Sequence, residues 1–119
     1  MVIENIEAEQ SVLWCILIDS LTLQDCTLNV DDFSSNNKAI FWAIKELQKD
    51  GTNIDLITVK TALEKSWKLE KIGGMTTLLE LTEIVPTTSN FSNYQDIVRE
   101  CSVQNKIKKI SGLILDNLS

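Results

Sequence analysis

Two adjacent glycines, Gly73 and Gly74, stand directly before a segment that the sequence predicts to be helical. Paired glycines at a helix start can cradle a phosphate, because the backbone N–H groups there attract an anion. A P-loop also needs a Lys after its glycines, but Met75, Thr76 and Thr77 follow here. The dinucleotide fingerprint G-x-G-x-x-G is absent as well. We therefore interpret the pair as a structural joint, at which Gly73 takes a positive φ and Gly74 lets the next helix start close by.

The side chains that most often carry catalysis or bind metals are missing or poorly spaced. Histidine, the commonest general base and metal ligand, does not occur. Cys15, Cys26 and Cys101 are too far apart for a C-x-x-C zinc pair, and we expect free thiols in the cytoplasm. The tightest acidic pair, Asp31 and Asp32, is typical of a turn or helix cap. The sequence thus predicts no catalytic, cofactor or metal site and no enzyme activity for this chain by itself.

The net charge limits the class of partner. The chain has 11 Lys and Arg against 17 Asp and Glu, a formal net charge of −6. Affinity for nucleic acid comes mostly from basic side chains on phosphates, so direct nucleic-acid binding is not expected. The only dense basic run, Lys106, Lys108 and Lys109, is predicted to be the solvated face of a helix. No apolar run approaches membrane-spanning length, and no membrane partner is expected.

Helical periodicity extends over most of the 119 residues, which predicts one all-α domain. The expected helices are one capped by Asn5, a short one opened by Ser20 or Thr22, one capped by Asn36 or Asn37 and ended at Gly51, one capped by Asp55, one over Met75–Val85 stopped by Pro86, and a long one from about Phe91 towards Leu118. Residues 1–72 are predicted to form a globular helical subdomain. Residues 73–119 are predicted to form a protruding antiparallel helical hairpin.

The two helices of this predicted hairpin carry more apolar side chains than they can bury against each other. The long helix repeats an apolar stripe at an average spacing near 3.5 residues. At about 1.5 Å per residue it is roughly 40 Å long, so part of it should project from so small a domain. A symmetric pair of hairpins would cover the excess. The predicted dimer or oligomer interface comprises Leu78, Leu81, Val85, Tyr94, Ile97, Cys101, Ile107, Ile110 and Ile114.

The three tryptophans have different expected roles. Trp14 lies inside an apolar helix and is expected to pack in the core. Trp67 would extend the inner stripe of the preceding helix if that helix reached so far. Trp42 falls on a charged helix face, near Lys38 and Lys45 at helical spacing. It is either a contact for a partner, since Trp is enriched at binding hot spots, or a ring lying flat on lysine stems.

Seven short motifs, in order, carry a resemblance to a known family. They are NIEAEQSVL, DDF, AIFWAIKEL, IDLITV, LEKIGG, LLELTEIVPTTSN and YQDIVRE, which span residues 5–100. Together they resemble the amino-terminal domain of bacterial and phage hexameric replicative DNA helicases. The resemblance implies a globular helical part with a protruding hairpin. In that family hairpins pair, and a hexamer built as a trimer of dimers forms a collar above the motor ring.

The resemblance also implies partners. The collar docks the carboxy-terminal domain of primase and can engage a helicase loader, while ATP and Mg²⁺ act in the motor domain, which these 119 residues do not contain. Family members often have an aromatic residue at the position of Thr77 and arginines near Asn105. The partner-binding candidates are therefore Trp42, Thr77, Asn105 and Lys108. The alternative is a free-standing regulator of the same fold, such as a phage-encoded one, that binds helicase or primase.

Overall fold

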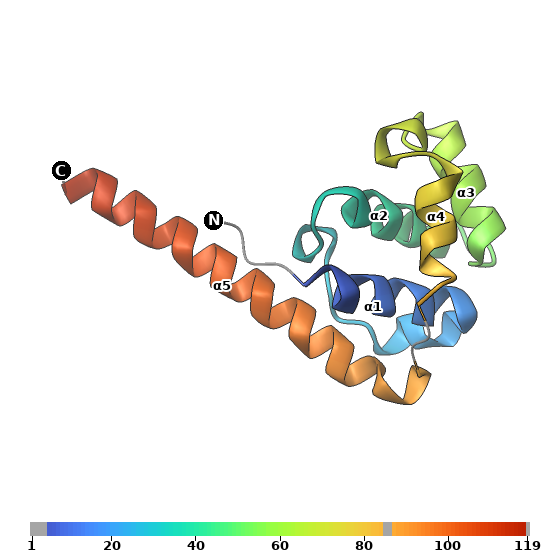
Figure 1. Cartoon of the computed structure of the whole chain (residues 1–119), viewed down its shortest axis with the longest axis horizontal. Coiled ribbons are helices and arrows are strands. Elements are labelled where there is room, and N and C mark those ends of the chain that lie inside the picture. Colours follow the sequence, from blue (N-terminus) through green and yellow to red (C-terminus); the bar gives the residue numbers. More distant parts are fainter. Residues whose placement is uncertain (1–4, 85–86, 119) are drawn as a thin grey trace.

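A computed structural model describes residues 5–84 and 87–118, with side chains up to residue 114. These residues form helices joined by short 3-10 turns, and the described part contains no strand (Figure 1). The α-helices are α1 (Ile6–Ile18), α2 (Ser35–Lys49), α3 (Leu56–Lys65), α4 (Met75–Leu81) and α5 (Phe91–Leu118), and the 3-10 turns are η1 (Ser20–Asp25), η2 (Val30–Asp32), η3 (Glu70–Ile72) and η4 (Thr88–Asn90). The prediction of an all-α fold is confirmed.

The first helix begins where its cap predicts. The Asn5 Oδ1 atom accepts the backbone N–H of Ala8 at 3.0 Å, which satisfies one of the free donors at the helix start. Apolar residues occupy all sides of α1, and Val12, Leu13 and Ile16 are fully buried. Because α1 is covered on most of its surface, it is the central helix of the domain.

A buried carboxylate joins α1 to the start of α2. Glu9 accepts hydrogen bonds from the backbone N–H of Ser34 at 2.8 Å and from Asn37 Nδ2 at 3.2 Å. Its negative charge lies at the amino-terminal end of α2, where the helix dipole favours an anion. The N-cap of α2 is Ser34, so the predicted cap at Asn36 or Asn37 is wrong. Both asparagines lie in the first turn because the contact with Glu9 fixes the start earlier.

Other predicted helix ends also shift. The second segment is a 3-10 turn capped by Asp19, whose side chain accepts the N–H of Leu21, and not by Ser20 or Thr22. The helix after the glycine pair ends at Leu81, earlier than predicted. The remainder of that prediction, Val85 and Pro86, lies outside the described residues.

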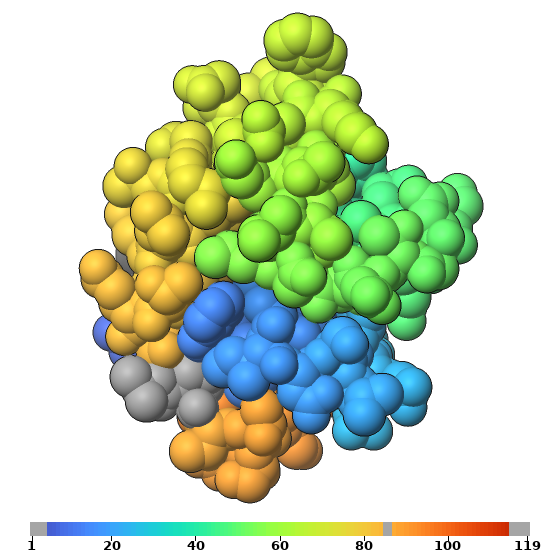
Figure 2. All heavy atoms as spheres, turned by 90° about the vertical axis from the view of Figure 1, so that its right-hand side faces the viewer, coloured from blue at the N-terminus to red at the C-terminus, as the bar shows by residue number. Residues whose placement is uncertain are grey.

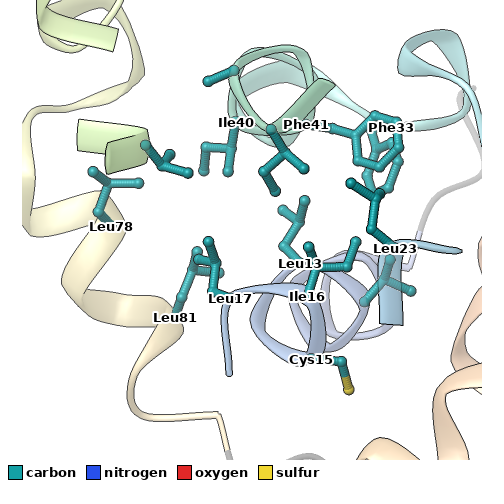
Figure 3. Close-up of a cluster of buried hydrophobic side chains, with 14 of the residues drawn as sticks. Leu13, Cys15, Ile16, Leu17, Leu23, Phe33, Ile40, Phe41, Leu78 and Leu81 are labelled. Atoms are coloured by element: carbon teal, nitrogen blue, oxygen red, sulfur yellow. The ribbon is translucent and has the colours of Figure 1, made fainter. Parts of the chain in front are cut away.

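One hydrophobic core contains residues from both predicted subdomains. Leu78 and Leu81 of α4 point into the space between α1 and α2, towards Leu17 and Ile40 (Figure 3). Phe91 and Val98 of α5, Phe33 and Phe41 also belong to this core, and the last two rings stack with centroids 4.5 Å apart. Residues on both sides of the predicted boundary at residue 73 therefore share one core.

Within the described residues, the end of α5 is the part that projects furthest from the body of the domain (Figure 1). α4 packs mainly on α1 and α3, whereas α5 packs along α1 (Figure 1). Beyond Ser102 no described side chain of α5 is buried, and the helix continues away from the body of the domain. The helix runs through Gly112 to Leu118, which confirms the expected long final helix.

Polar contacts fix the direction in which α5 leaves the domain. Gln95 Oε1 accepts the backbone N–H of Thr27 at 2.7 Å. Asp32 accepts the Ser102 hydroxyl at 2.6 Å, and the Lys106 ammonium lies 3.6 Å from the same carboxylate. The Gln95 contact lies near the start of α5 and the Ser102 and Lys106 contacts lie at the last turns that touch the domain, so the latter two hold the base of the projecting part.

Candidate interaction surfaces

The projecting part of α5 carries an apolar stripe that no described residue of the chain covers. Val103, Ile107, Ile110 and Ile114 are each 46% to 57% exposed. At about 100° per residue these positions share one side of the helix, nearly opposite the side on which Val98 enters the core. We name these four residues the outer stripe. Its exposure is a property of the fold, because the same helix buries its other side.

Part of the predicted interface is used differently in the structure. Leu78 and Leu81 are fully buried in the core of this chain, so they cannot also face a second copy, and the prediction for them is wrong. Tyr94 and Cys101 are half-buried on the inner side of α5. Tyr94 accepts the backbone N–H of Thr87 at 3.3 Å through its hydroxyl oxygen. These two side chains help to seat α5 on the domain.

Of the remaining predicted interface residues, Val85 lies outside the described residues and the others lie on α5. Ile97 is exposed on the flank of the helix, away from the outer stripe, and Ile107, Ile110 and Ile114 form most of that stripe. Val103 was not among the predicted interface residues. The predicted stripe on α5 followed an average spacing near 3.5 residues and therefore included Cys101 and Gln104. The exposed apolar positions instead follow the helical period of 3.6 residues and include Val103.

Trp42 is half-buried and its ring packs partly on the core. The Lys68 ammonium lies 4.6 Å from the ring centroid, which is a cation–π contact. This geometry supports the alternative of a ring lying against a lysine, although that lysine comes from the segment after α3 and not from α2. A hollow of about 310 Å³ adjoins the ring and is lined by Lys38, Lys68, Ala39 and other residues. The outer part of Trp42 is therefore accessible to a partner.

The other three partner-binding candidates lie at separate places. Thr77 is half-buried, and its hydroxyl donates to the carbonyl oxygen of Ile72 at 2.6 Å. Asn105 lines a polar hollow of about 170 Å³ between α5 and η2, together with Asp32. Lys108 is exposed on the projecting part of α5. The structure does not bring the four candidates together into one site.

Gly73 has the positive φ that the sequence predicts, and Gly74 has a positive φ as well. Gly73 has φ +106° and closes η3, while Gly74 has φ +77° and precedes α4. L-residues with side chains rarely adopt either value. Because α4 belongs to the core, the glycine pair sets the direction in which α4 packs on α1. It does not set the direction in which a hairpin leaves the domain.

Substitution at Gly73 tests this joint. A Cβ atom there would lie 2.5 Å from Thr77 Oγ1, so Gly73→Ala adds a steric clash to the backbone strain. We expect it to lower the free energy of unfolding by about 2–4 kcal/mol. Gly51→Ala is the matched control, because Gly51 has φ +70° with open space around it and should lose only about 1 kcal/mol. Urea denaturation of both variants measures the difference.

The same measurement in a Thr77→Ala background separates strain from clash. Removing the hydroxyl should bring the cost of Gly73→Ala down to that of Gly51→Ala. An unchanged cost in that background would contradict the clash with Thr77.

Trp67 is an exposed aromatic residue, and the helix before it does not reach far enough for Trp67 to extend its inner stripe. α3 ends at Lys65, so Trp67 does not continue its inner stripe, and the ring is 85% exposed. Trp67 has φ +60°, the left-handed position after a helix that glycine usually occupies. Lys68 N–H donates to Leu63 O at 2.9 Å and Trp67 N–H to Glu64 O at 3.1 Å, which is the Schellman pattern. The two neighbours of Trp67 in the sequence, Ser66 and Lys68, are polar. They are the only sequence signal that the ring of Trp67 is exposed.

The cysteines and acidic groups provide no reactive or metal-binding cluster in the described part of the chain. Cys15, Cys26 and Cys101 are free thiols, and burial raises the pKa of each above its ordinary value. No group of three or more potential ligands is placed to hold a metal ion among the described residues. Within the same residues, no helix is both long and apolar enough to span a bilayer.

Comparison with known proteins identifies the family. The family described as the DnaB-like helicase N terminal domain matches residues 2–100. This chain belongs to the DnaB-like helicase N-terminal domain family. The resemblance drawn from the seven motifs is therefore confirmed.

Relatives of known sequence are replicative helicases. The chain is 40% identical over 114 residues to the replicative DNA helicase DnaB of Buchnera aphidicola subsp. Baizongia pistaciae, a match covering 93% of this chain and 25% of that protein. It is 36% identical over 107 residues to the DnaB of Geobacillus stearothermophilus, covering 87% and 24%. The chain thus spans about a quarter of the length of these relatives and corresponds to their DnaB-like N-terminal domain.

Solved structures of the DnaB family share the fold. The crystal structure of the N-terminal domain of DnaB helicase from Mycobacterium tuberculosis has a TM-score of 0.88 at 27% identity, covering 98% of this chain and 83% of that one. A DnaB-like replicative helicase, described together with its interactions with primase, has a TM-score of 0.84 at 28% identity. That match covers 96% of this chain and 28% of the other.

Proposed function

We propose that this domain is a non-catalytic oligomerisation and docking module of a replicative DNA helicase. The outer stripe carries the proposal, because four apolar side chains on a projecting helix are left uncovered by the described part of the chain. Pairing of α5 with α5 of a second copy would bury them. In a whole helicase, such dimers would build a hexamer as a trimer of dimers.

The charges on α5 limit where two copies can pair. Asp96 and Glu100 occupy the same side of the helix as the outer stripe, about two turns and one turn before Val103, and both are exposed. Burying either carboxylate without a partner charge would be unfavourable. The paired segment therefore covers residues 103–114 and can continue towards the end of α5. Self-association through this segment leaves the body of the domain free for other partners.

The second part of the proposal is docking of primase or a helicase loader. Its support is the family, together with the structural relative whose interactions with primase are described. The hollow beside Trp42 is the candidate contact, because it combines an aromatic face with Lys38 and Lys68 and would suit an acidic segment. ATP and Mg²⁺ are proposed to act in the motor domain of the whole helicase, and the site of action is the cytoplasm.

A pull-down with the carboxy-terminal domain of the cognate primase tests docking. We expect this chain to retain the primase domain and Trp42→Ala to lower its affinity at least about tenfold. Ile57→Ala is the control, because Ile57 is an exposed apolar residue on α3 outside this hollow. Failure of the unmodified chain to retain the primase domain would contradict the docking proposal, and an unchanged affinity of Trp42→Ala would exclude the hollow as its contact.

A further inference from the structure

Trp67 and its neighbours form a surface that the folding of the domain does not explain. Trp67 is 85% exposed, the highest value among the large apolar side chains that the structure describes. The hydrogen bonds of the turn after α3 use only backbone atoms of residue 67, so Gly or Asn would support them with less strain. A ring held in a strained, exposed position points to a use outside the chain.

A hollow beside the ring shows what it would bind. Its volume is about 260 Å³, and it is lined by Glu64, Trp67, Leu69 and Glu70. An aromatic ring and two carboxylates that line the same hollow attract a cation through both the ring quadrupole and the negative charges. We propose that Trp67, Glu64 and Glu70 form a docking site for an arginine-bearing segment of a partner protein.

None of the four nearby lysines, Lys60, Lys65, Lys68 and Lys71, lines this hollow. The Lys68 ammonium lies over Trp42, and Lys65 lines a different hollow beside Leu47. Lys60 lies 3.5 Å from Glu64, but both side chains are largely exposed, so the pair is weak. Among the described residues, Glu70 has no ion-pair partner within 4.0 Å.

Arginine fits this site better than lysine. Its planar guanidinium stacks on an indole face while its N–H groups donate to carboxylates at the edge, and an ammonium cannot do both. The apolar stem of the arginine, or an aliphatic neighbour, would contact Leu69, which lines the same hollow. The partner segment should therefore combine arginine with aliphatic residues.

The site lies on the body of the domain, away from the projecting part of α5. α3 is at the opposite end of the molecule from the C-terminus (Figure 1), and the segment after α3, yellow-green in Figure 2, forms an outer edge of that face. The inference goes beyond the proposed function, because it needs neither self-association nor primase. Its test can fail while those proposals hold, and the reverse is also true.

Titration with a short peptide tests the site directly. The probe is acetyl-Leu-Arg-Leu-Arg-Leu-amide, and the readout is the indole N–H signals of the three tryptophans in ¹⁵N-labelled chain, assigned with single Trp→Phe variants. We expect the Trp67 signal to shift and saturate at millimolar peptide, with the Trp14 signal unmoved. The same peptide with citrulline in place of arginine keeps the shape without the charge and should bind at least about fivefold more weakly.

Variants separate binding from folding. Glu64→Gln/Glu70→Gln should weaken binding at least about fivefold, whereas Ile57→Ala should leave it unchanged. Trp67→Gly should abolish saturable binding, observed through backbone signals of Leu69 and Glu70, and yet raise the melting temperature by roughly 4 °C, because the backbone strain is relieved. Equal binding of the citrulline peptide, an unmoved Trp67 signal or undiminished binding by Trp67→Gly would overturn the proposal.

Discussion

Leu78→Ala is expected to lower the free energy of unfolding by about 2–5 kcal/mol. Leu78 is fully buried, and Figure 3 shows it in the space that α4 shares with α1 and α2. Shortening its side chain leaves a cavity in a core that holds the whole domain together. Leu81→Ala should have an effect of the same size, because Leu81 is buried in the same cluster.

Leu79→Ala is the matched control for this prediction. Leu79 is the next residue of α4, is 49% exposed and should lose less than about 1 kcal/mol. Urea denaturation followed by circular dichroism gives the three values, and all variants should unfold in one transition. Similar small losses for Leu78→Ala and Leu79→Ala would contradict the packing of α4 in the core. Two separate transitions would instead support a boundary at residue 73.

Ile107→Asp is expected to weaken self-association at least about 100-fold, which corresponds to about 3 kcal/mol. Ile107 lies at the centre of the outer stripe and is 57% exposed in the single chain. In a paired α5 the carboxylate would be buried without a partner charge, and a symmetric dimer would contain it twice. The fold of the single chain should change little, because the substituted side chain lies outside the core.

Gly112→Asp is the control for the charge on the projecting helix. It adds the same carboxylate five residues further along, on the side of α5 away from the outer stripe, and a Cβ atom at Gly112 has open space around it. Sedimentation equilibrium should show association unchanged for Gly112→Asp and lost for Ile107→Asp. Equal weakening by both substitutions would indicate a general effect of charge and would contradict pairing through the stripe.

Helix positions were predictable from the sequence because their signals are local. Asn5 and Asp55 cap α1 and α3 as predicted, and Gly73 has the positive φ that its place before a helix suggested. Each signal depends on residues within about one helical turn. The start of α2 was misplaced because its cap is decided by Glu9, which is distant in the sequence.

The surfaces were less predictable because burial depends on which helices meet. The apolar faces of α4 and α5 are equally clear in the sequence, yet α4 is buried on α1 and the outer stripe is exposed. Trp67 would have continued the apolar stripe of α3 in a longer helix, and the end of α3 at Lys65 leaves it exposed. The family resemblance supplied the fold and the expectation of pairing, but not these residue-level assignments.

The most direct test of the central claim is the molar mass of the unmodified chain in solution. Multi-angle light scattering after gel filtration, over a series of loading concentrations, measures it. If the outer stripe mediates self-association, the mass should rise with concentration to that of a dimer or a larger assembly of the 13.4 kDa chain. A mass that stays at one chain up to the highest concentration would contradict the proposal that this domain assembles through α5.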